Sequence, residues 1–294
     1  MTSESLWRPY TQMLTAAPGV LIRRAQGAWL YGRDKERFLD AISSWWVITH
    51  GHCHPPIVDA VIRQATELEQ VLFANFTHER AIELTELLLQ VTPEELKHVF
   101  LSDNGSTAVE AALKIAYQAC VQLGKPEKKL FIGFEGGFHG DTVGAMSVSS
   151  ESVFSKTFAN MKFAVLRARQ GYYSSDPVDS FVLPFEKLLK EHRETVAGVI
   201  LEPLVQGAAG MIMWPVDAVR RIAKLCRDFH VTLIFDEVMT GFGRTGTLFA
   251  MDQVGLAPDI LCLSKGLTGG MLPLGATLVT DKIYGAFLST DRAK

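Results

Sequence analysis

Two short apolar segments, each ending abruptly in a charged residue, constrain the fold of this 294-residue chain more than any other feature. Residues 231–237 read VTLIFDE, and residues 259–266 read DILCLSKG. Runs of this length, rich in β-branched residues or leucine, are typical of buried strands in a parallel sheet. Asp236 and Lys265 would then lie just beyond the carboxyl ends of two strands, which is the edge where open α/β sheets bind ligands.

A carboxylate and an amine at one sheet edge suit the chemistry of pyridoxal phosphate. In such enzymes a lysine forms a Schiff base with the cofactor, and a carboxylate keeps the pyridine nitrogen protonated so that the ring accepts electrons. The two strands alone leave a second interpretation open, in which Asp236 and Lys265 form an ordinary salt bridge at the rim of the sheet.

The segments around this pair alternate between strand and helix. Strand patterns are expected at residues 98–101, 129–133, 196–201 and 276–280, and helix patterns at 56–72, 78–91, 108–116, 215–230 and 281–287. This alternation predicts an α/β fold with a mainly parallel sheet and helices on both of its faces. Residues 19–27 and 28–34 instead predict a small antiparallel meander outside the main sheet, because they read as short strands joined at glycine.

A phosphate-binding turn is indicated where the strand at 98–101 leads into the next helix. Residues 102–107 read SDNGST, and the free N–H groups and dipole of a helix start favour an anion. Capping of the helix by Asn104 or Ser106 explains the same residues without any ligand.

The loop after the strand at 129–133 reads FEGGFHGDT over residues 134–142. Its glycines allow the close approach of a flat ligand, and Phe138 could stack on a heteroaromatic ring. A flexible loop with one buried phenylalanine is the alternative.

Two further motifs suggest other ligands but lack the context that those ligands require. Residues 241–246 read GFGRTG, yet a dinucleotide fingerprint needs its first glycine at the strand end and a helix immediately after it. Arg244 is therefore interpreted as an anchoring or substrate-facing cation. His50, His52 and His54 flank Cys53, but a tetrahedral metal site usually draws ligands from a second segment, and no metal is expected here.

The composition favours a cytoplasmic protein that binds small molecules. The net charge is −3 with both signs scattered, so we expect neither nucleic acid nor a membrane surface as a partner. The four cysteines lie far apart, as is typical of reduced thiols. No signal segment is recognisable at the N-terminus, and no apolar run approaches the ~20 residues that a membrane helix requires.

Taken together, the motifs resemble the class III pyridoxal phosphate-dependent aminotransferases, of fold type I. Five segments carry the resemblance, which extends from Trp7 to Thr280: residues 102–114, 137–141, 202–203, 236–246 and 263–266. The family implies ping-pong transamination and a homodimer with its sites at the subunit interface.

The resemblance also implies a role for each matching residue. Lys265 carries the cofactor and then moves a proton between the substrate and the cofactor. The resemblance makes Asp236 the partner of the pyridine nitrogen, and Gly105 and Ser106 bind the phosphate through their backbone N–H groups. Val238 and Phe138 pack on the two faces of the ring. Arg244 contacts the substrate.

Two N-terminal stretches narrow the resemblance within this family. Residues 7–13 read WRPYTQM, and SSWW at 43–46 is followed by HG at 50–51. They resemble the branch that transfers an amino group from S-adenosylmethionine to 8-amino-7-oxononanoate in biotin synthesis, and this branch places Tyr10 and Trp45 against the substrate. The residues alone equally allow a packing clip around Pro9, and the alternatives are another class III ω-amino acid aminotransferase or a chain without activity.

Two departures from the family accompany the resemblance. Phe138 stands where this branch usually has tyrosine, which removes a hydroxyl but retains a ring that can stack. The family chain is also longer, and its continuation supplies a threonine for the neighbouring subunit's phosphate and a carboxylate-binding arginine. We therefore expect residues 1–45 to be the N-terminal segment of the small domain, residues 46–294 to be the large cofactor-binding domain, and the C-terminal small domain to be absent.

Overall fold

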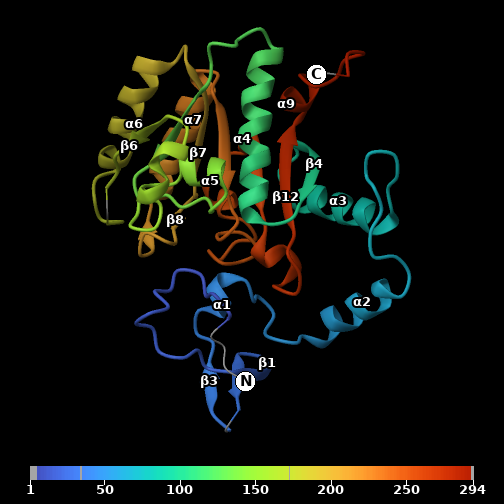
Figure 1. The fold of residues 1–294 in the computed structure, drawn as a ribbon. Coiled ribbons are helices and arrows are strands. Elements are labelled where there is room, and N and C mark those ends of the chain that lie inside the picture. The colour runs from blue at the N-terminus through green and yellow to red at the C-terminus, as the bar shows by residue number, and fades with distance from the viewer. Residues whose placement is uncertain (1–4, 34, 172, 293–294) are drawn as a thin grey trace.

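The computed structural model describes residues 5–33, 35–171 and 173–292 (Figure 1). Its elements are β1 Ile22–Gln26, β2 Trp29–Gly32, β3 Arg37–Leu39, α1 Ser43–Trp46, α2 Pro55–Ala65, α3 Glu79–Val91, β4 Leu96–Ser102, α4 Gly105–Gln122, β5 Leu130–Phe134, α5 Val143–Val148, β6 Val165–Ala168, α6 Val178–His192, β7 Val196–Leu201, β8 Val205–Gln206, β9 Ile212–Met213, α7 Val216–Asp228, β10 Thr232–Asp236, α8 Ala250–Val254, β11 Ile260–Leu263, β12 Gly275–Thr280 and α9 Asp281–Gly285. Short 3-10 helices cover Lys156–Met161 and Lys265–Thr268.

A seven-stranded sheet in the order β4-β12-β11-β10-β7-β5-β6 forms the centre of the molecule. The strands from β11 to β6 pair in parallel, whereas β12 is antiparallel to both of its neighbours. The prediction of a mainly parallel sheet is therefore confirmed. Since β4 pairs across β12, it runs in the same direction as β11, so β4, β5, β7, β10 and β11 all end at one edge.

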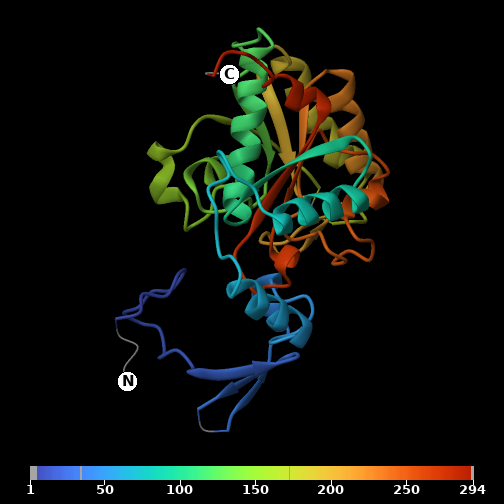
Figure 2. The same ribbon diagram turned by 90° about the vertical axis from the view of Figure 1, so that its right-hand side faces the viewer.

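Helices cover both faces of this sheet, as the alternation of segments predicts (Figure 2). Side chains of α4, α5 and α9 pack on one face around Ala112, Ile234 and Cys262. On the other face, α3, α6, α7 and α8 bury a larger cluster that includes Phe185 and Phe235. Strands covered on both sides carry apolar residues at consecutive positions, which is why β7 is buried along its whole length.

The N-terminal residues form a separate small sheet, as predicted. Strands β1, β2 and β3 pair antiparallel, and Gly27 makes the first turn with a φ of 56°. Asp34, the last residue of the second predicted strand, lies outside the described residues. A bridge between Gly27 and His52 ties this sheet to the segment that follows it.

The segment that begins at α1 lies near the carboxyl edge of the large sheet, whereas β1 and β3 project away from it (Figure 1). A Cβ atom added to Gly269 would lie 3.3 Å from Nδ1 of His50, and one added to Gly270 would lie 2.9 Å from the carbonyl oxygen of Val47. The loop after β11 therefore packs directly on residues 47–50. The sequence predicts that helix α2 ends at residue 72, but it ends at Ala65. None of the described helices is both long and apolar enough to cross a membrane.

Candidate active site

Asp236 is the last residue of β10 and is buried with only 3% of its surface exposed. Its Oδ2 atom lies 2.7 Å from Nδ1 of His139, and its Oδ1 atom accepts a hydrogen bond of 3.0 Å from the backbone N–H of Val238. A carboxylate that is held at both oxygens has a fixed orientation. Asp236 is therefore partnered by a histidine, and the ion pairs within 4.0 Å among the described residues do not include Asp236 with Lys265.

Lys265 follows β11 and adopts a left-handed backbone conformation with a φ of 43°. Its amine lies 5.1 Å from the centroid of the Trp46 ring. Burial lowers the pKa of this amine, and Arg244 acts in the same direction, while the charges of Asp236 and Glu202 oppose the shift. The amine is thus within electrostatic reach of Asp236, and a larger fraction of it is neutral and nucleophilic than in an exposed lysine.

The start of α4 faces the same edge of the sheet. Asn104 caps the helix, because its side chain accepts a hydrogen bond of 3.1 Å from the N–H of Thr107. The capping interpretation is therefore confirmed for Asn104. Among the described residues, however, no hydrogen bond uses the N–H groups of Gly105 or Ser106, so two donors at this helix start remain for an anion.

Gly105 also brings the backbone of this turn close to the residues after β10. A Cβ atom at residue 105 would lie 2.7 Å from Cγ1 of Val238 and 3.5 Å from Cβ of Ser264. Val238 lies two residues after Asp236, and Ser264 directly precedes Lys265. The structure thus brings four of the predicted site residues together at one point of the sheet edge.

The loop after β5 is held by a buried glutamate. Glu202, at the end of β7, accepts hydrogen bonds of 3.1 Å from the N–H of Phe138 and 3.2 Å from the N–H of Gly207. Burial raises the pKa of its carboxyl to about 7, and the nearby Asp236 charge adds to this effect. Phe138 as a residue is 38% exposed, so it is accessible for stacking, and the loop is not simply a flexible segment with a buried phenylalanine.

Tyr10 contacts the loop that also reaches the helix start. Its hydroxyl donates to Oδ2 of Asp141, whose N–H donates to Oγ of Ser106 over 3.3 Å. The Tyr10 ring packs edge-on against Trp45, at a centroid distance of 5.7 Å, and against Phe154 at 5.0 Å. Burial, followed by the Asp141 hydrogen bond, raises the pKa of the phenol. Tyr10 and Trp45 therefore form one aromatic wall beside the site.

The paired tryptophans lie in a left-handed turn and not in a strand. Residues 43–46 have φ values of 50°, 48°, 62° and 63°. This conformation costs about 1–2 kcal/mol per residue for L-amino acids. Asp40 stabilises the turn by accepting from the N–H and the hydroxyl of Ser44, and Arg244 donates to the carbonyl oxygen of Trp46 over 3.0 Å. Arg244 therefore anchors this turn, the first of its two predicted roles.

The histidine-rich segment contains no metal cluster in the described part of the chain. Nε2 of His52 lies 2.9 Å from Oδ2 of Asp40, and Nδ1 of His50 lies 2.9 Å from the hydroxyl of Thr49. These contacts give two of the three histidines a structural role.

Two residues that the sequence patterns left without a role, His139 and Glu202, lie in the centre of the site. Glu202 directly follows β7, which is nearly the same positional signal that identifies Asp236, whereas His139 lies in the loop after β5. His139 is 4% exposed, and its Nε2 atom is buried without a hydrogen-bond partner. Their importance becomes visible only when β5, β7 and β10 are placed side by side.

These residues fit pyridoxal phosphate, a flat ring that carries an aldehyde, a ring nitrogen and a phosphate. Two free N–H groups at the start of α4 suit the phosphate. Asp236 suits the ring nitrogen and Lys265 suits the aldehyde, and the absence of a side chain at Gly105 lets the helix start approach Val238 closely.

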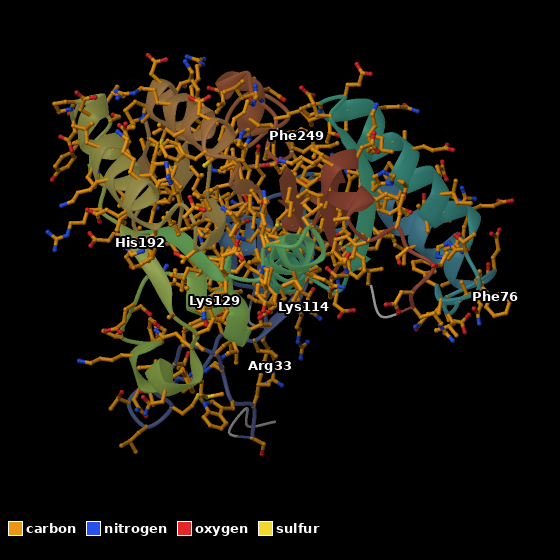
Figure 3. All side chains as sticks on the ribbon, turned by 90° about the horizontal axis from the view of Figure 1, so that it is seen from above. Arg33, Phe76, Lys114, Lys129, His192 and Phe249 are labelled. Atoms are coloured by element: carbon orange, nitrogen blue, oxygen red, sulfur yellow. The ribbon has the colours of Figure 1, made fainter. Side chains whose placement is uncertain are left out.

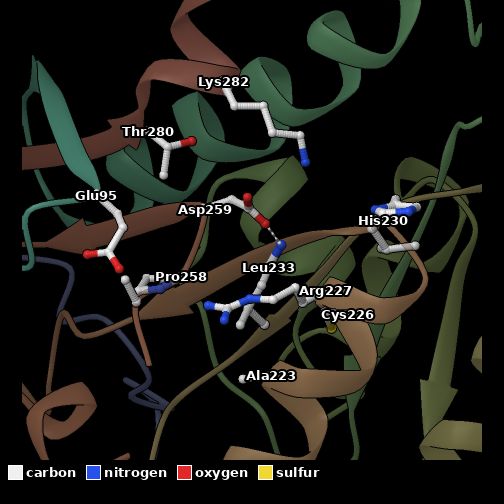
Figure 4. Close-up of a pocket in the computed structure, with 12 residues that line it drawn as sticks. Glu95, Ala223, Cys226, Arg227, His230, Leu233, Pro258, Asp259, Thr280 and Lys282 are labelled. Carbon is white, nitrogen blue, oxygen red and sulfur yellow. Dashed lines mark hydrogen bonds between the residues drawn. The ribbon is translucent and has the colours of Figure 1, made fainter. Parts of the chain in front are cut away.

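A cleft of about 210 Å³ lies at the opposite edge of the sheet (Figure 4). It is lined by residues at the beginnings of the parallel strands, among them Leu233, whose N–H donates to Asp259 over 2.9 Å. Asp236 and Lys265 lie at the other ends of those strands. The cleft is therefore not part of the candidate active site.

Comparison with known proteins identifies relatives along nearly the whole chain. The sequence profile of the class III aminotransferases matches residues 11–294. The adenosylmethionine-8-amino-7-oxononanoate aminotransferase of Synechococcus elongatus is 44% identical over 290 residues, which are 97% of this chain and 68% of that protein.

Two solved structures extend the likeness to three dimensions. The adenosylmethionine-8-amino-7-oxononanoate aminotransferase of Methanocaldococcus jannaschii has a TM-score of 0.91 and 39% identity, covering 98% of this chain and 66% of that one. A PLP-bound amine transaminase from an uncultivated Pseudomonas species has a TM-score of 0.88 and 33% identity, covering 96% of this chain and 66% of that one. The chain thus spans about two thirds of the length of these relatives, and it belongs to the class III aminotransferase family.

Proposed function

We propose that this protein is a pyridoxal phosphate-dependent transaminase of biotin biosynthesis, which transfers an amino group from S-adenosylmethionine to 8-amino-7-oxononanoate and so gives 7,8-diaminononanoate. The observation that carries the proposal is geometric: the half-buried Lys265, whose amine lies 5.1 Å from the centroid of the Trp46 ring, follows β11 at the same carboxyl edge of the sheet as the fixed, buried carboxylate of Asp236. Class III aminotransferases depend on pyridoxal phosphate, which supplies an electrophilic carbonyl and an electron sink.

Lys265 is the residue that we assign to covalent binding and proton transfer. Attack on a carbonyl requires the neutral amine, and burial favours that form. With the cofactor bound, the same amine would be placed to take a proton from the donor carbon and to return it elsewhere. One side chain can therefore serve both half-reactions.

Asp236 is the residue that we assign to the ring nitrogen. His139 and the N–H of Val238 fix its two oxygens, so the carboxylate faces the site without having to reorganise. We assign Gly105 and Ser106 to binding of the cofactor's phosphate. We assign Phe138 and Val238 to the two faces of its ring.

The choice of substrate is assigned to the wall formed by Tyr10 and Trp45. Relatives with at least 36% identity are named as enzymes that act on 8-amino-7-oxononanoate, which favours this substrate. Amine and ω-transaminases also share the fold, so transamination of another ω-amine is the second candidate. Arg244 is assigned to substrate contact in addition to its hydrogen bond to Trp46.

A covalent labelling experiment tests the central assignment. The purified protein is mixed with pyridoxal phosphate and treated with borohydride, and the modified peptide is identified by mass spectrometry. We expect the label on Lys265, and no visible absorption band of bound cofactor in Lys265→Ala or in the charge-preserving control Lys265→Arg. A protein that remains colourless with excess cofactor would instead support the alternative of a catalytically silent chain.

A donor comparison tests the substrate assignment separately. S-adenosylmethionine, β-alanine and putrescine are offered with 8-amino-7-oxononanoate as acceptor, and 7,8-diaminononanoate is measured. Product formed with S-adenosylmethionine alone supports the biotin-pathway function. Faster reaction with β-alanine or putrescine identifies the second candidate.

We also propose that the protein forms a homodimer. Between α2 and α3 the chain exposes several large apolar side chains within a short stretch of sequence, namely Ile62, Leu72, Phe73, Phe76 and Ile82. Phe76 lies at the outer margin of the molecule, far from the sheet, whereas Phe249 is in its interior (Figure 3). Several exposed large apolar side chains in one stretch of the chain favour an interaction site there. Sedimentation of the wild type and of Phe76→Asp is the test, and we expect the variant to shift toward monomer.

Two smaller assignments accompany the dimer. We place residues 1–45 in the small domain of the family and residues 46–294 in the large domain, because the three-stranded sheet has its own hydrogen-bond pattern. We place the protein in the cytoplasm, because its four cysteines are free thiols.

A further inference from the structure

Arg167 on β6 is a partly buried cation whose partners in the described residues are backbone carbonyls and no carboxylate. Its guanidinium donates to the carbonyl oxygens of Ser147, Val148 and Ser149, the last over 2.6 Å. These carbonyls belong to the end of α5, where helix carbonyls otherwise lack donors. Burial lowers the pKa of Arg167 to about 10, so it remains charged at neutral pH.

Gly133 makes this arrangement possible. It pairs with Arg167 across β5 and β6. A Cβ atom at residue 133 would collide with the guanidinium and would lie 2.6 Å from the carbonyl oxygen of Val148. Since the backbone here is ordinary strand, glycine is required for space and not for its conformation. Gly133 and Arg167 together clamp the end of α5.

The clamped end of α5 holds the loop that carries His139. The hydroxyl of Ser149 accepts a 2.8 Å hydrogen bond from the N–H of His139 and donates one of 2.8 Å to the carbonyl oxygen of Ala145. In addition, the N–H of Ser150 donates to the carbonyl oxygen of Gly137 over 2.7 Å. The loop is therefore fixed on both sides of Phe138.

From these contacts we infer that Arg167 and Ser149 are positioning residues for recognition of the cofactor's ring nitrogen. They act through His139, whose Nδ1 atom lies 2.7 Å from Oδ2 of Asp236, and so determine where the Asp236 carboxylate stands. This inference rests on the proposed function. Arg167 and Ser149 would contribute to cofactor binding although neither of them touches the cofactor.

The physical reason is that the connections from Ser149 to His139 and from His139 to Asp236 are short, buried and directional. Ser149, His139 and Asp236 are each less than 5% exposed, so water cannot replace a lost partner. Loss of the Ser149 hydroxyl leaves the His139 N–H unsatisfied, so that His139 is held only through the bonds of its neighbours Gly137 and Phe138. The His139–Asp236 contact weakens, and Asp236 shifts relative to the ring nitrogen.

A binding cycle with a modified cofactor separates positioning from general structural damage. Dissociation constants are measured for pyridoxal phosphate and for its analogue in which carbon replaces the ring nitrogen, in the wild type, Ser149→Ala and Arg167→Lys. We expect both variants to bind pyridoxal phosphate roughly fivefold to tenfold more weakly, as for the loss of one buried hydrogen bond. Binding of the carbon analogue should change less than twofold, because it offers no nitrogen to Asp236.

The matched control is Ser147→Ala, two residues earlier on α5. Ser147 is equally buried and its hydroxyl also bonds two backbone groups, Val143 and Phe163, but it does not contact the His139 loop. It should alter the ratio of the two dissociation constants less than twofold. Ser149→Thr, which keeps the hydroxyl, should restore the wild-type ratio.

The outcomes distinguish the inference from the proposed function. Equal weakening of both ligands in Ser149→Ala and Arg167→Lys would mean that the clamp is merely structural, and it would overturn the inference alone. A wild type that binds neither ligand would overturn the proposed function as well. If Ser149→Ala does not fold, Ser149→Cys and Arg167→Lys provide the same comparison.

Discussion

Replacing Gly105 by alanine should damage the cofactor site through a single methyl group. The added carbon would lie 2.7 Å from Cγ1 and 3.2 Å from Cγ2 of Val238. Apolar carbons prefer about 3.5–4.0 Å, so one of the two residues must move by about 1 Å. Because Gly105 begins α4, which is anchored to the sheet, we expect Val238 to move into the space that is assigned to the ring.

The magnitude follows from two opposing effects. Overpacking of this kind costs about 1–3 kcal/mol, while alanine in place of glycine favours a helix by about 0.5–1 kcal/mol. The free energy of unfolding should therefore fall by at most about 2.5 kcal/mol. Cofactor binding should weaken further, on the order of tenfold, which corresponds to about 1.4 kcal/mol.

Denaturant unfolding and equilibrium dialysis with pyridoxal phosphate measure these two effects independently. The double variant Gly105→Ala/Val238→Ala removes both methyl groups that the new carbon would meet, and it should recover most of the lost stability. Gly285→Ala on α9 is the matched control, because no atom lies within 4 Å of its added carbon, and it should not weaken cofactor binding. If Gly105→Ala binds the cofactor as tightly as the wild type, Val238 does not define a ring face and the reasoning is wrong.

Three further perturbations follow from the structure. Burial raises the pKa values of Glu202 and Glu237 to about 7 from 4.5, so protonation of these carboxyls favours the folded state at low pH. This contribution, about 3 kcal/mol for each carboxyl, is lost as the pH rises through 7. The free energy of unfolding measured in urea titrations should therefore fall from about pH 5 to 7, and Glu237→Gln should flatten that slope. Gly133→Ala should lower the free energy of unfolding by at least about 2 kcal/mol, because its carbon collides with Arg167, whereas a change below about 0.5 kcal/mol in thermal unfolding would refute the clamp. Arg244→Gln should release the Trp46 carbonyl and raise the rate of proteolytic cleavage within residues 43–50 about fivefold, and an unchanged rate would show that Arg244 does not anchor the turn.

The positions of the strand ends could be predicted from the sequence because local chemistry is sufficient there. A buried parallel strand needs a continuous apolar run, and the first polar residue after it must lie at the sheet edge. This rule is enough to place Asp236 and Lys265 at the same edge. The same rule applies to Glu202, but a buried glutamate that holds a loop has the same local pattern as one that contacts a ligand.

Contacts between distant segments could not be predicted in this way. The left-handed turn at residues 43–46 opposes local backbone preference and persists because Asp40 and Arg244, which is 198 residues away from Trp46, hold it. Strand β6 was not predicted, because an edge strand with a central arginine lacks the apolar run of a buried strand.

The sequence by itself therefore determined the chemistry available at the sheet edge, since strand and helix patterns depend on neighbouring residues. Tertiary structure alone decided how that chemistry is oriented. The pairing of His139 with Asp236, and of Arg167 with the end of α5, depends on the spatial order of β5, β6, β7 and β10. Such directional hydrogen bonds require two partners at a fixed distance, and only the folded chain sets that distance.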